Sequence, residues 1–333
     1  MEIYFIFLFI TIFNLIVFYK FDTISQSLTF FDKPDGKLKN HSKPVSLIGG
    51  LIILINLYLI IFSLSFLNFK NLIFENNFMF GLILLSTLFY LIGLVDDIKN
   101  LSPNKKLIFL FISTIIVIYF FPSINLEHIK ISFLKDIFYF EYSKIFLVFS
   151  FALLANSMNM FDGINLQLIL FTSFLFIVFI LKGFLSIFFI LLLICLFFLA
   201  ILNYKNKVFL GDGGAYLISV IVGCTFIYQY DNFSNFFYGD EVFIILIIPA
   251  IDMLRLFFMR VIKKKSPFKG DLNHLHHIVN NFTKNNNFTI LITISLSIFP
   301  ALLLIFNIET YIILLLSLII YFCLISYLRF KVR

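Results

Sequence analysis

Four groups of ionisable and amide side chains interrupt a chain of 333 residues that is otherwise strongly apolar. They are the Asp96-Asp97 pair, the run from Asn156 to Asp162, the Gly211-Asp212-Gly213 segment and the run from Asp271 to His277. Such groups are costly at a bilayer boundary, so several that converge on one membrane face indicate a functional site. In an alternating topology all four fall on the same face, which predicts an enzyme that acts at one leaflet.

The composition is that of an integral membrane protein. The chain is 61% hydrophobic and 13% charged, whereas soluble domains have about 25% charged residues. Eleven apolar runs are each long enough to cross a hydrocarbon core of ~30 Å. They cover about 3–19, 45–67, 78–95, 106–121, 144–161, 166–181, 184–202, 215–230, 241–261, 288–306 and 311–328. We expect an all-α polytopic bundle of about 11 transmembrane helices, forming a single domain over residues 1–333.

The basic residues predict the orientation of this bundle. Nineteen Lys and Arg side chains lie in the loops after odd-numbered spans and at the C-terminus, against five in the other loops. By the positive-inside rule the N-terminus is outside, and the C-terminus and the four polar groups are cytoplasmic. The net charge of +7 then reflects topology and anionic headgroups. It does not indicate a nucleic-acid partner, because no basic stripe is interleaved with exposed aromatic residues.

The Asp96-Asp97 pair ends the third predicted span. A solvated helix end is the alternative interpretation. Against it, carboxylates at a helix C-terminus oppose the helix macrodipole, and two adjacent carboxylates repel each other unless a cation neutralises them. The pair therefore predicts a Mg²⁺ ion or a phosphate–metal complex as its partner.

The run from Asn156 to Asp162 places polar side chains at helical spacing. Asn156 and Asn159 are three residues apart, so their amides share a helix face, and Asp162 extends that face toward the cytosol. A buried amide can also hold transmembrane helices together. Because an Asp-Gly break follows the two amides, we favour contacts with a polar substrate.

Asp212 lies in a glycine-rich segment that opens the eighth predicted span. Glycines let backbone amides approach an anion and leave the carboxylate free to bind a metal ion. A simple N-cap would explain the carboxylate but not the three glycines around it.

The run from Asp271 to His277 contains three histidines in four residues and follows Lys263, Lys264 and Lys265. Imidazoles are common zinc ligands, but this spacing is not that of a zinc protease and no cysteine accompanies it. Beside lysines, and on the same face as the carboxylates, the histidines are better suited to binding and polarising a diphosphate.

Taken in order, these motifs resemble those of the polyprenyl-phosphate N-acetylhexosamine-1-phosphate transferases. The match includes Asp32-Lys33-Pro34-Asp35, Lys39, His41, Pro44, Gly49-Gly50, Asp96-Asp97, residues 156–163, residues 209–212, Asp252, Arg255, Ser266-Pro267-Phe268 and residues 271–277. The His274-Leu275-His276-His277 form, with no acidic residue after it, is similar to the branch that transfers an N-acetylhexosamine.

The resemblance implies a reaction and a set of roles. A lipid phosphate attacks the β-phosphorus of a UDP-sugar and releases UMP, at the first membrane step of cell-envelope polysaccharide synthesis in the bacterial inner membrane. The implied catalytic residues are Asp96 and Asp97, and the implied ligands of Mg²⁺ (or Mn²⁺) are Asp212 and Asp97. The implied substrate-binding residues are Lys39, His41, Lys43, Asn156, Asn159, Asp162, Arg255, His274, His276 and His277. The partners are a UDP-N-acetylhexosamine, undecaprenyl phosphate and the lipid bilayer, with a homodimer as an open possibility.

Six positions depart from the family pattern. They are Asn165, where an acidic residue is common, Leu166-Gln167 in place of Gly-Leu, Ala215 in place of Ser, Leu47 in place of a basic residue, and Leu272 in place of Arg. These departures leave the identity of the sugar open and the reaction type intact.

Two other functions would leave different signals in the sequence. A transporter or lipid flippase with a proton relay would place ionisable groups near the bilayer midplane and show repeated halves. Here the acids are at span ends and no inverted repeat is found. An intramembrane metalloprotease would need an HExxH helix, which the sequence lacks.

Overall fold

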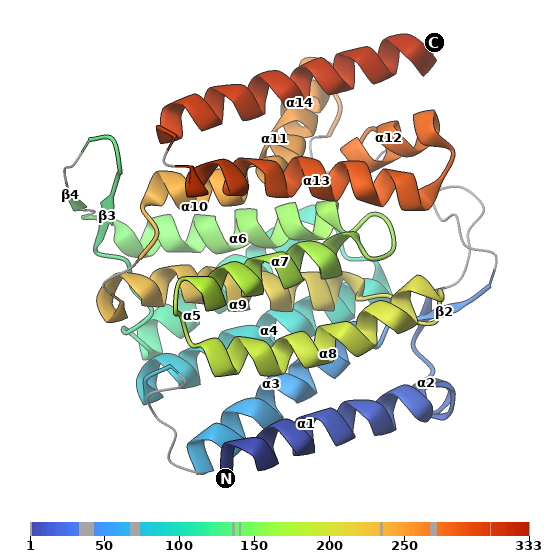
Figure 1. The fold of residues 1–333 in the computed structure, drawn as a ribbon, viewed down its shortest axis with the longest axis vertical. Helices are drawn as coiled ribbons and strands as arrows, with labels where there is room; N and C mark the ends of the chain where they lie inside the picture. Colours follow the sequence, from blue (N-terminus) through green and yellow to red (C-terminus); the bar gives the residue numbers. More distant parts are fainter. Residues whose placement is uncertain are drawn as a thin grey trace.

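Long helices lying side by side make up most of the molecule (Figure 1). The computed structural model describes residues 2–32, 43–66, 74–134, 137–139, 141–233, 236–266, 272–306 and 308–332. The first half of the chain forms α1 (Glu2–Tyr19), α2 (Phe21–Leu28), α3 (Gly49–Phe66), α4 (Asn76–Lys99), α5 (Pro103–Phe120), α6 (Ser143–Phe161) and α7 (Gln167–Leu181). The second half forms α8 (Ser186–Tyr204), α9 (Gly211–Asn232), α10 (Gly239–Ile245), α11 (Ile247–Ile262), α12 (Leu275–Thr283), α13 (Asn286–Ile305) and α14 (Thr310–Val332).

The predicted all-α membrane fold is confirmed. Among the described residues, nine helices are long and apolar enough to cross a membrane. The α10–α11 pair, bent by 75°, raises the number to ten if it is one broken span. The predicted span 166–181 corresponds to α7, an apolar helix of 15 residues, which at 1.5 Å per residue is shorter than a ~30 Å hydrocarbon core.

Helix α9 is the centre of the bundle, with 83% of its span buried, and it packs against α3, α4 and α6. The start of α9 lies especially close to α4, because a Cβ atom on Gly93 would overlap the backbone of Gly213. Small residues that let helix backbones approach closely are typical of membrane helix packing. The carboxylates at the end of α4 and the start of α9 are thereby held together.

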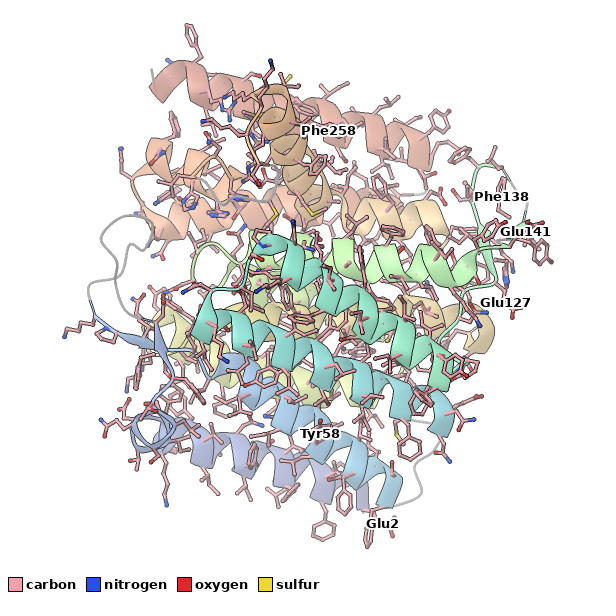
Figure 2. The ribbon with its side chains drawn as sticks, turned by 180° about the vertical axis from the view of Figure 1, so that it is seen from behind. Glu2, Tyr58, Glu127, Phe138, Glu141 and Phe258 are labelled. Carbon is pink, nitrogen blue, oxygen red and sulfur yellow. The ribbon has the colours of Figure 1, made fainter. Side chains whose placement is uncertain are left out.

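The outer helices present apolar side chains to their surroundings. Only 17–28% of the span of α1, α5, α13 and α14 is buried. Seen from behind, Tyr58 on α3 and Phe258 on α11 point outward (Figure 2), with exposures of 37% and 58%. An apolar exterior of this kind is expected when lipid rather than water is the solvent.

Within the described ranges, two short antiparallel strand pairs mark the two ends of the bundle. β3 (His128–Lys130) pairs with β4 (Ile137–Tyr139) at one end, while β1 (Phe31–Asp32) pairs with β2 (Val45–Ser46) at the other, near α2 and α12 (Figure 1). The chain begins and ends at opposite ends of the helices. The polar groups gather at the end that carries α12.

Candidate functional site

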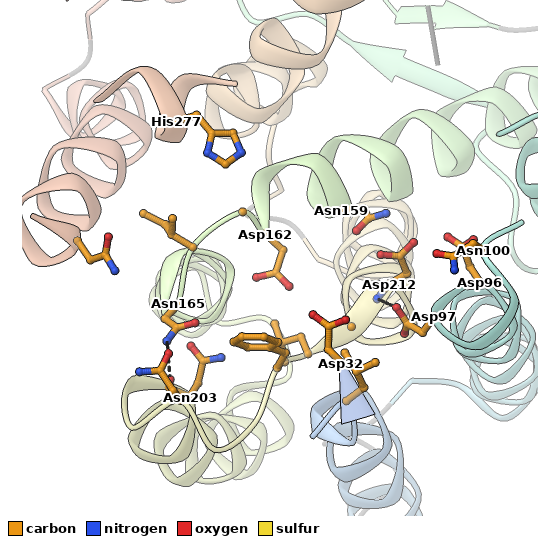
Figure 3. A pocket seen from close by; sticks show the side chains of 18 of the residues that line it. Asp32, Asp96, Asp97, Asn100, Asn159, Asp162, Asn165, Asn203, Asp212 and His277 are labelled. Carbon is orange, nitrogen blue, oxygen red and sulfur yellow. Dashed lines mark hydrogen bonds between the residues drawn. The ribbon is translucent and has the colours of Figure 1, made fainter. Parts of the chain in front are cut away.

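A polar cavity of about 460 Å³ opens at the α12 end of the bundle (Figure 3). Its lining includes Asp32, Asp96, Asp97, Asn100, Lys106, Asn159, Asp162, Gly163, Ile164, Asn165, Asn203, Asn206, Phe209, Gly211, Asp212, His277, Asn280 and Asn286. Segments that are far apart in the sequence meet here: the end of α4, the end of α6, the start of α9 and the first turn of α12. All four polar groups found in the sequence therefore contribute to one cavity.

The carboxylate of Asp97 is hydrogen-bonded to the start of α9. Its Oδ1 accepts a hydrogen bond from the backbone N–H of Asp212 at 3.1 Å, and its Oδ2 accepts one from Gly213 at 3.5 Å. The first N–H groups of a helix lack partners within the helix, and the helix dipole favours a negative charge there. Gly211 permits this approach, because its φ is +71° and a Cβ atom there would lie 2.5 Å from Asp97 Oδ2.

Lys106 is a cavity residue that the sequence analysis missed. Its ammonium group forms an ion pair with Asp96 and lies 3.4 Å from Asp212 Oδ2. Asp96 is only 4% exposed, and it also accepts a hydrogen bond from the backbone N–H of Leu101 at 2.8 Å. The sequence does contain a signal for this role. A lysine near the N-terminus of a helix is unfavourable with respect to the helix macrodipole, as are aspartates near a C-terminus, so Lys106 in α5 and the two aspartates of α4 are unusual in the same way.

The carboxylates of the cavity have the chemistry of a site for a hard divalent cation. Among the described residues, no group of three His, Cys, Asp or Glu side chains is arranged to hold a metal ion. The ammonium group of Lys106 nevertheless lies between Asp96 and Asp212, so a positive charge is favoured at that point. Carboxylate oxygens are the ligands that Mg²⁺ prefers, usually one or two from the protein with water and phosphate completing the shell. The donor set therefore fits Mg²⁺ if Lys106 moves aside.

The three polar residues at the end of α6 do not share one environment. Asn159 and Asp162 line the cavity, whereas Asn156 does not and donates from Nδ2 to the carbonyl of Ala152 at 2.7 Å. Asp162 follows the last residue of α6 and faces the middle of the cavity (Figure 3). Burial, with a smaller contribution from the nearby charge of Asp97, raises the pKa of Asp162 to about 7.

Asparagine side chains form another wall of the cavity. Asn203 Oδ1 accepts from the backbone N–H of Leu166 at 2.6 Å, and Asn203 Nδ2 donates to the carbonyl of Val208 at 2.7 Å. Asn165 Nδ2 donates to the carbonyl of Asn203 at 2.9 Å and to Asn206 Oδ1 at 2.7 Å. Asn203 thus ties the loop after α6 to the loop before α9. Neither it nor Phe209, which also lines the cavity, was assigned a role from sequence.

The three histidines lie in different surroundings. His277 lines the cavity. His276 is 3% exposed and packs against Gly163, where a Cβ atom would overlap its ring. Burial, together with the nearby His277 and His274, lowers the pKa of His276 well below its usual value.

His274 and Arg255 do not line the cavity in this structure. Both contact Asp252 on α11: His274 Nδ1 lies 3.2 Å from Asp252 Oδ2, and Arg255 Nη2 donates to Asp252 Oδ1 at 2.8 Å. Their side chains are 8% exposed. We therefore assign them to the support of the cavity wall rather than to direct contact with a substrate, which differs from the prediction.

Of the remaining predicted binding residues, Lys43 is exposed and is not part of the cavity lining. Lys39 and His41 lie outside the described residues, as does Asp271. Asp32, at the end of β1, does line the cavity and brings the segment after α2 to its edge (Figure 3).

Comparison with known proteins gives consistent matches. A sequence model described as "Glycosyl transferase family 4" matches residues 79–230, which include Asp96, Asp97, Asp162 and Asp212. An undecaprenyl-phosphate alpha-N-acetylglucosaminyl 1-phosphate transferase of Thermotoga maritima is 26% identical over 264 residues, covering 76% of this chain and 74% of that protein. Proteins of the same name from Salmonella typhi and Escherichia coli K12 are 33% and 30% identical over 102 and 106 residues. These two alignments cover 28% and 29% of the relatives' lengths.

Proposed function

We propose that the chain belongs to glycosyl transferase family 4 and that it transfers a sugar 1-phosphate from a UDP-sugar to undecaprenyl phosphate. The observation that carries this proposal is the cavity at one end of the bundle, where five aspartates, Lys106 and His277 meet. The named relatives act on undecaprenyl phosphate and an N-acetylglucosaminyl 1-phosphate group, which supports N-acetylglucosamine as the first sugar to test. A transporter is not favoured, because the ionisable groups of the cavity lie at one end of the bundle.

The reaction is a displacement at phosphorus. An oxygen of the lipid phosphate forms a bond to the β-phosphorus of the UDP-sugar, and the bond from that phosphorus to the bridging oxygen breaks, so that UMP leaves. Such a reaction is accelerated mainly by positioning and by stabilisation of charge. Mg²⁺, held by Asp212 together with Asp96 or Asp97, would supply that stabilisation. Asp96 or Asp97 takes the proton of the attacking phosphate where it carries one, and His277 donates to the diphosphate.

The two walls of the cavity suit the two ends of a UDP-sugar. The asparagine wall includes Asn165, whose side-chain Oδ1 is not used in the bonds described above, Asn206 and the ring of Phe209. An amide oxygen and an aromatic face would match the edge and face of a pyrimidine base. The carboxylate wall lies across the cavity from it (Figure 3). The diphosphate would then lie between them, within reach of Asp162 and His277.

An apolar groove supports a lipid as the acceptor. A second cavity of about 350 Å³ lies between α6, α9 and the bent α10–α11 pair, with Phe146, Leu154, Phe226 and Leu254 in its lining. Its lining includes Ser157 on α6, the helix that carries Asn159 into the polar cavity. A polyprenyl chain in this groove would place its phosphate near the end of α6.

The same proposal implies how the protein is oriented in the membrane and in which membrane it lies. The cavity would face the cytoplasm, where UDP-sugars are made, with the N-terminus outside and the protein in a bacterial inner membrane. Single cysteines at Asn104 and Asn285 should then resist an impermeant thiol reagent in whole cells, whereas a cysteine at Glu127 should react. The exposed Cys323 is removed first. If the cysteine introduced at Asn285 reacted in intact cells, the orientation would be the opposite of the proposed one. The product would serve envelope polysaccharide assembly.

The test of the activity uses purified protein, undecaprenyl phosphate and a panel of UDP-sugars labelled in the sugar. We expect one N-acetylhexosamine to become lipid-linked in the presence of Mg²⁺ or Mn²⁺, and the activity to disappear in EDTA. Asp212→Asn should insert in the membrane normally and be inactive. Full turnover in EDTA would remove the metal from the proposal, and failure of every UDP-sugar to label the lipid would contradict the function itself.

A further inference from the structure

Tyr321, on the last helix α14, is fully buried at 0% exposure. Its hydroxyl donates a hydrogen bond to Asp252 Oδ1 at 2.6 Å and accepts one from Arg255 Nε at 2.8 Å. Since Arg255 Nη2 also donates to Asp252 Oδ1, the three side chains form a closed ring of hydrogen bonds. This ring joins α14 to α11. Hydrogen bonds to charged groups in a buried setting are among the stronger ones.

Asp252 in turn holds the first residues of α12. Its two carboxylate oxygens lie 3.2 and 3.3 Å from the backbone nitrogen of Leu275, which donates to them. His274, at the N-cap position, makes no side-chain cap bond of its own, so Asp252 does what an N-cap residue usually does. Arg255 Nη2 donates to the carbonyl of Asn273 at 2.6 Å. Asp252 and Arg255 together thereby hold three consecutive residues, 273–275, in place.

His277 lies two residues beyond this fixed segment and reaches the cavity. Between them, the ring of His276 is stacked on His274, with centroids 5.6 Å apart, and lies 4.2 Å from His277. Gly163 limits the movement of His276 on its other side. A shift at the start of α12 would therefore move His277 relative to the cavity.

We propose that Tyr321 is a positioning residue for His277, acting through Asp252 and the first turn of α12. The inference rests on the proposed function, because it takes His277 to bind the diphosphate of a UDP-sugar. It makes the last helix of the bundle part of the support of the site, although Tyr321 does not line the cavity.

The test is Tyr321→Phe, which keeps the ring and removes the hydroxyl. We expect the KM for the UDP-sugar to rise about tenfold, the factor that corresponds to one such hydrogen bond, with kcat within about twofold of wild type. The matched control is Tyr327→Phe on the same helix, whose side chain is 53% exposed, and it should change neither constant. A fall in kcat at unchanged KM is what loss of folded protein produces, and it would overturn the proposal.

Two further measurements separate positioning from general destabilisation. In a His277→Ala background, Tyr321→Phe should add no further rise in KM, because the group it positions is gone. Additive effects would contradict the proposal.

Hydrogen exchange on the protein without substrate should show faster exchange in residues 275–283 of Tyr321→Phe, with α9 unchanged. If the wild-type protein proved inactive on every UDP-sugar while this exchange pattern held, the proposed function would fail and the coupling of α14 to α12 would stand. Unchanged exchange in residues 275–283 would overturn the coupling.

Discussion

The carboxylate of Asp97 and the backbone N–H of Asp212 are hydrogen-bonded across 3.1 Å, so the end of α4 caps the start of α9. These two aspartates were predicted from sequence as a catalytic residue and a metal ligand. The bond between them means that Asp97 has a structural contribution in addition to any chemical one. Its two contributions can be separated by choice of substitution.

Asp97→Asn keeps one side-chain oxygen that can accept from Asp212, whereas Asp97→Ala keeps none. We expect Asp97→Asn to unfold near the wild-type temperature but to lose about 10²-fold in kcat, as expected for the loss of acid–base help. Asp97→Ala should in addition be destabilised by about 1–3 kcal/mol, because the N–H groups at the start of α9 lose their partner. Thermal unfolding and steady-state kinetics on both variants check this. A fully active Asp97→Asn enzyme would remove Asp97 from the chemistry.

If Asp212 holds the proposed cation, Lys106 competes with that cation, because its ammonium group lies 3.4 Å from Asp212 Oδ2 and is paired with Asp96. Removing its positive charge in Lys106→Met should therefore tighten Mn²⁺ binding by about tenfold or more, since an opposing charge a few Å away is removed. Electron paramagnetic resonance of Mn²⁺ added to the purified protein measures the affinity without substrate. Lys105→Met is the matched control, because Lys105 is exposed and is not part of the cavity lining. Equal affinity in wild type and Lys106→Met would place the metal elsewhere.

Gly163 and His276 are in contact, and the added methyl group of Gly163→Ala would overlap the imidazole. We expect this variant to insert normally but to lose about 10²-fold in kcat/KM, because displacement of a catalytic group by about 1 Å can cost that much. Gly183→Ala is the comparison for strain outside the cavity lining, because its φ of +84° disfavours alanine although no atom lies within 4 Å of a Cβ atom there. It should lose stability and keep the wild-type kcat/KM. Wild-type kinetics in Gly163→Ala would show that the segment His274–His277 can be displaced without loss of activity.

The neutral form of His276 is favoured in the folded protein, because burial lowers its pKa. Below about pH 6.5 the unfolded chain protonates this side chain while the folded protein does not. The free energy of unfolding therefore decreases as the pH falls below about 6.5. His276→Gln, which cannot be protonated, should lose less stability between pH 7.5 and 5.5 than wild type in denaturant titrations. An identical loss in both proteins would mean that other groups account for the pH dependence.

Most of the cavity could be predicted from sequence, because its acidic and amide residues are conspicuous in an apolar chain. Asp96, Asp97, Asn159, Asp162 and Asp212 all reach it. The apolar runs likewise predicted the helices, since hydrophobic length alone identifies a membrane span.

The differences between the expected and observed site have local causes. Sequence does not show which way a charged side chain near a helix end points, so Arg255 and His274 were assigned to the substrate rather than to Asp252. The i,i+3 spacing of Asp252 and Arg255 was a usable signal of an ion pair. Asn203 was missed because an amide near a helix end has many uses, and its bonds to the loops at Leu166 and Val208 require the tertiary structure.

The most direct test of the central proposal follows two labels of one substrate. Purified protein receives undecaprenyl phosphate, Mg²⁺ and UDP-N-acetylglucosamine labelled with tritium in the sugar and with ³²P at the β-phosphate. The account predicts that both labels enter the lipid in equal amounts and that UMP is released in the same amount, with Asp212→Asn giving neither. Tritium in the lipid with ³²P left in UDP would show transfer of the sugar alone, and would contradict the transfer of a sugar 1-phosphate.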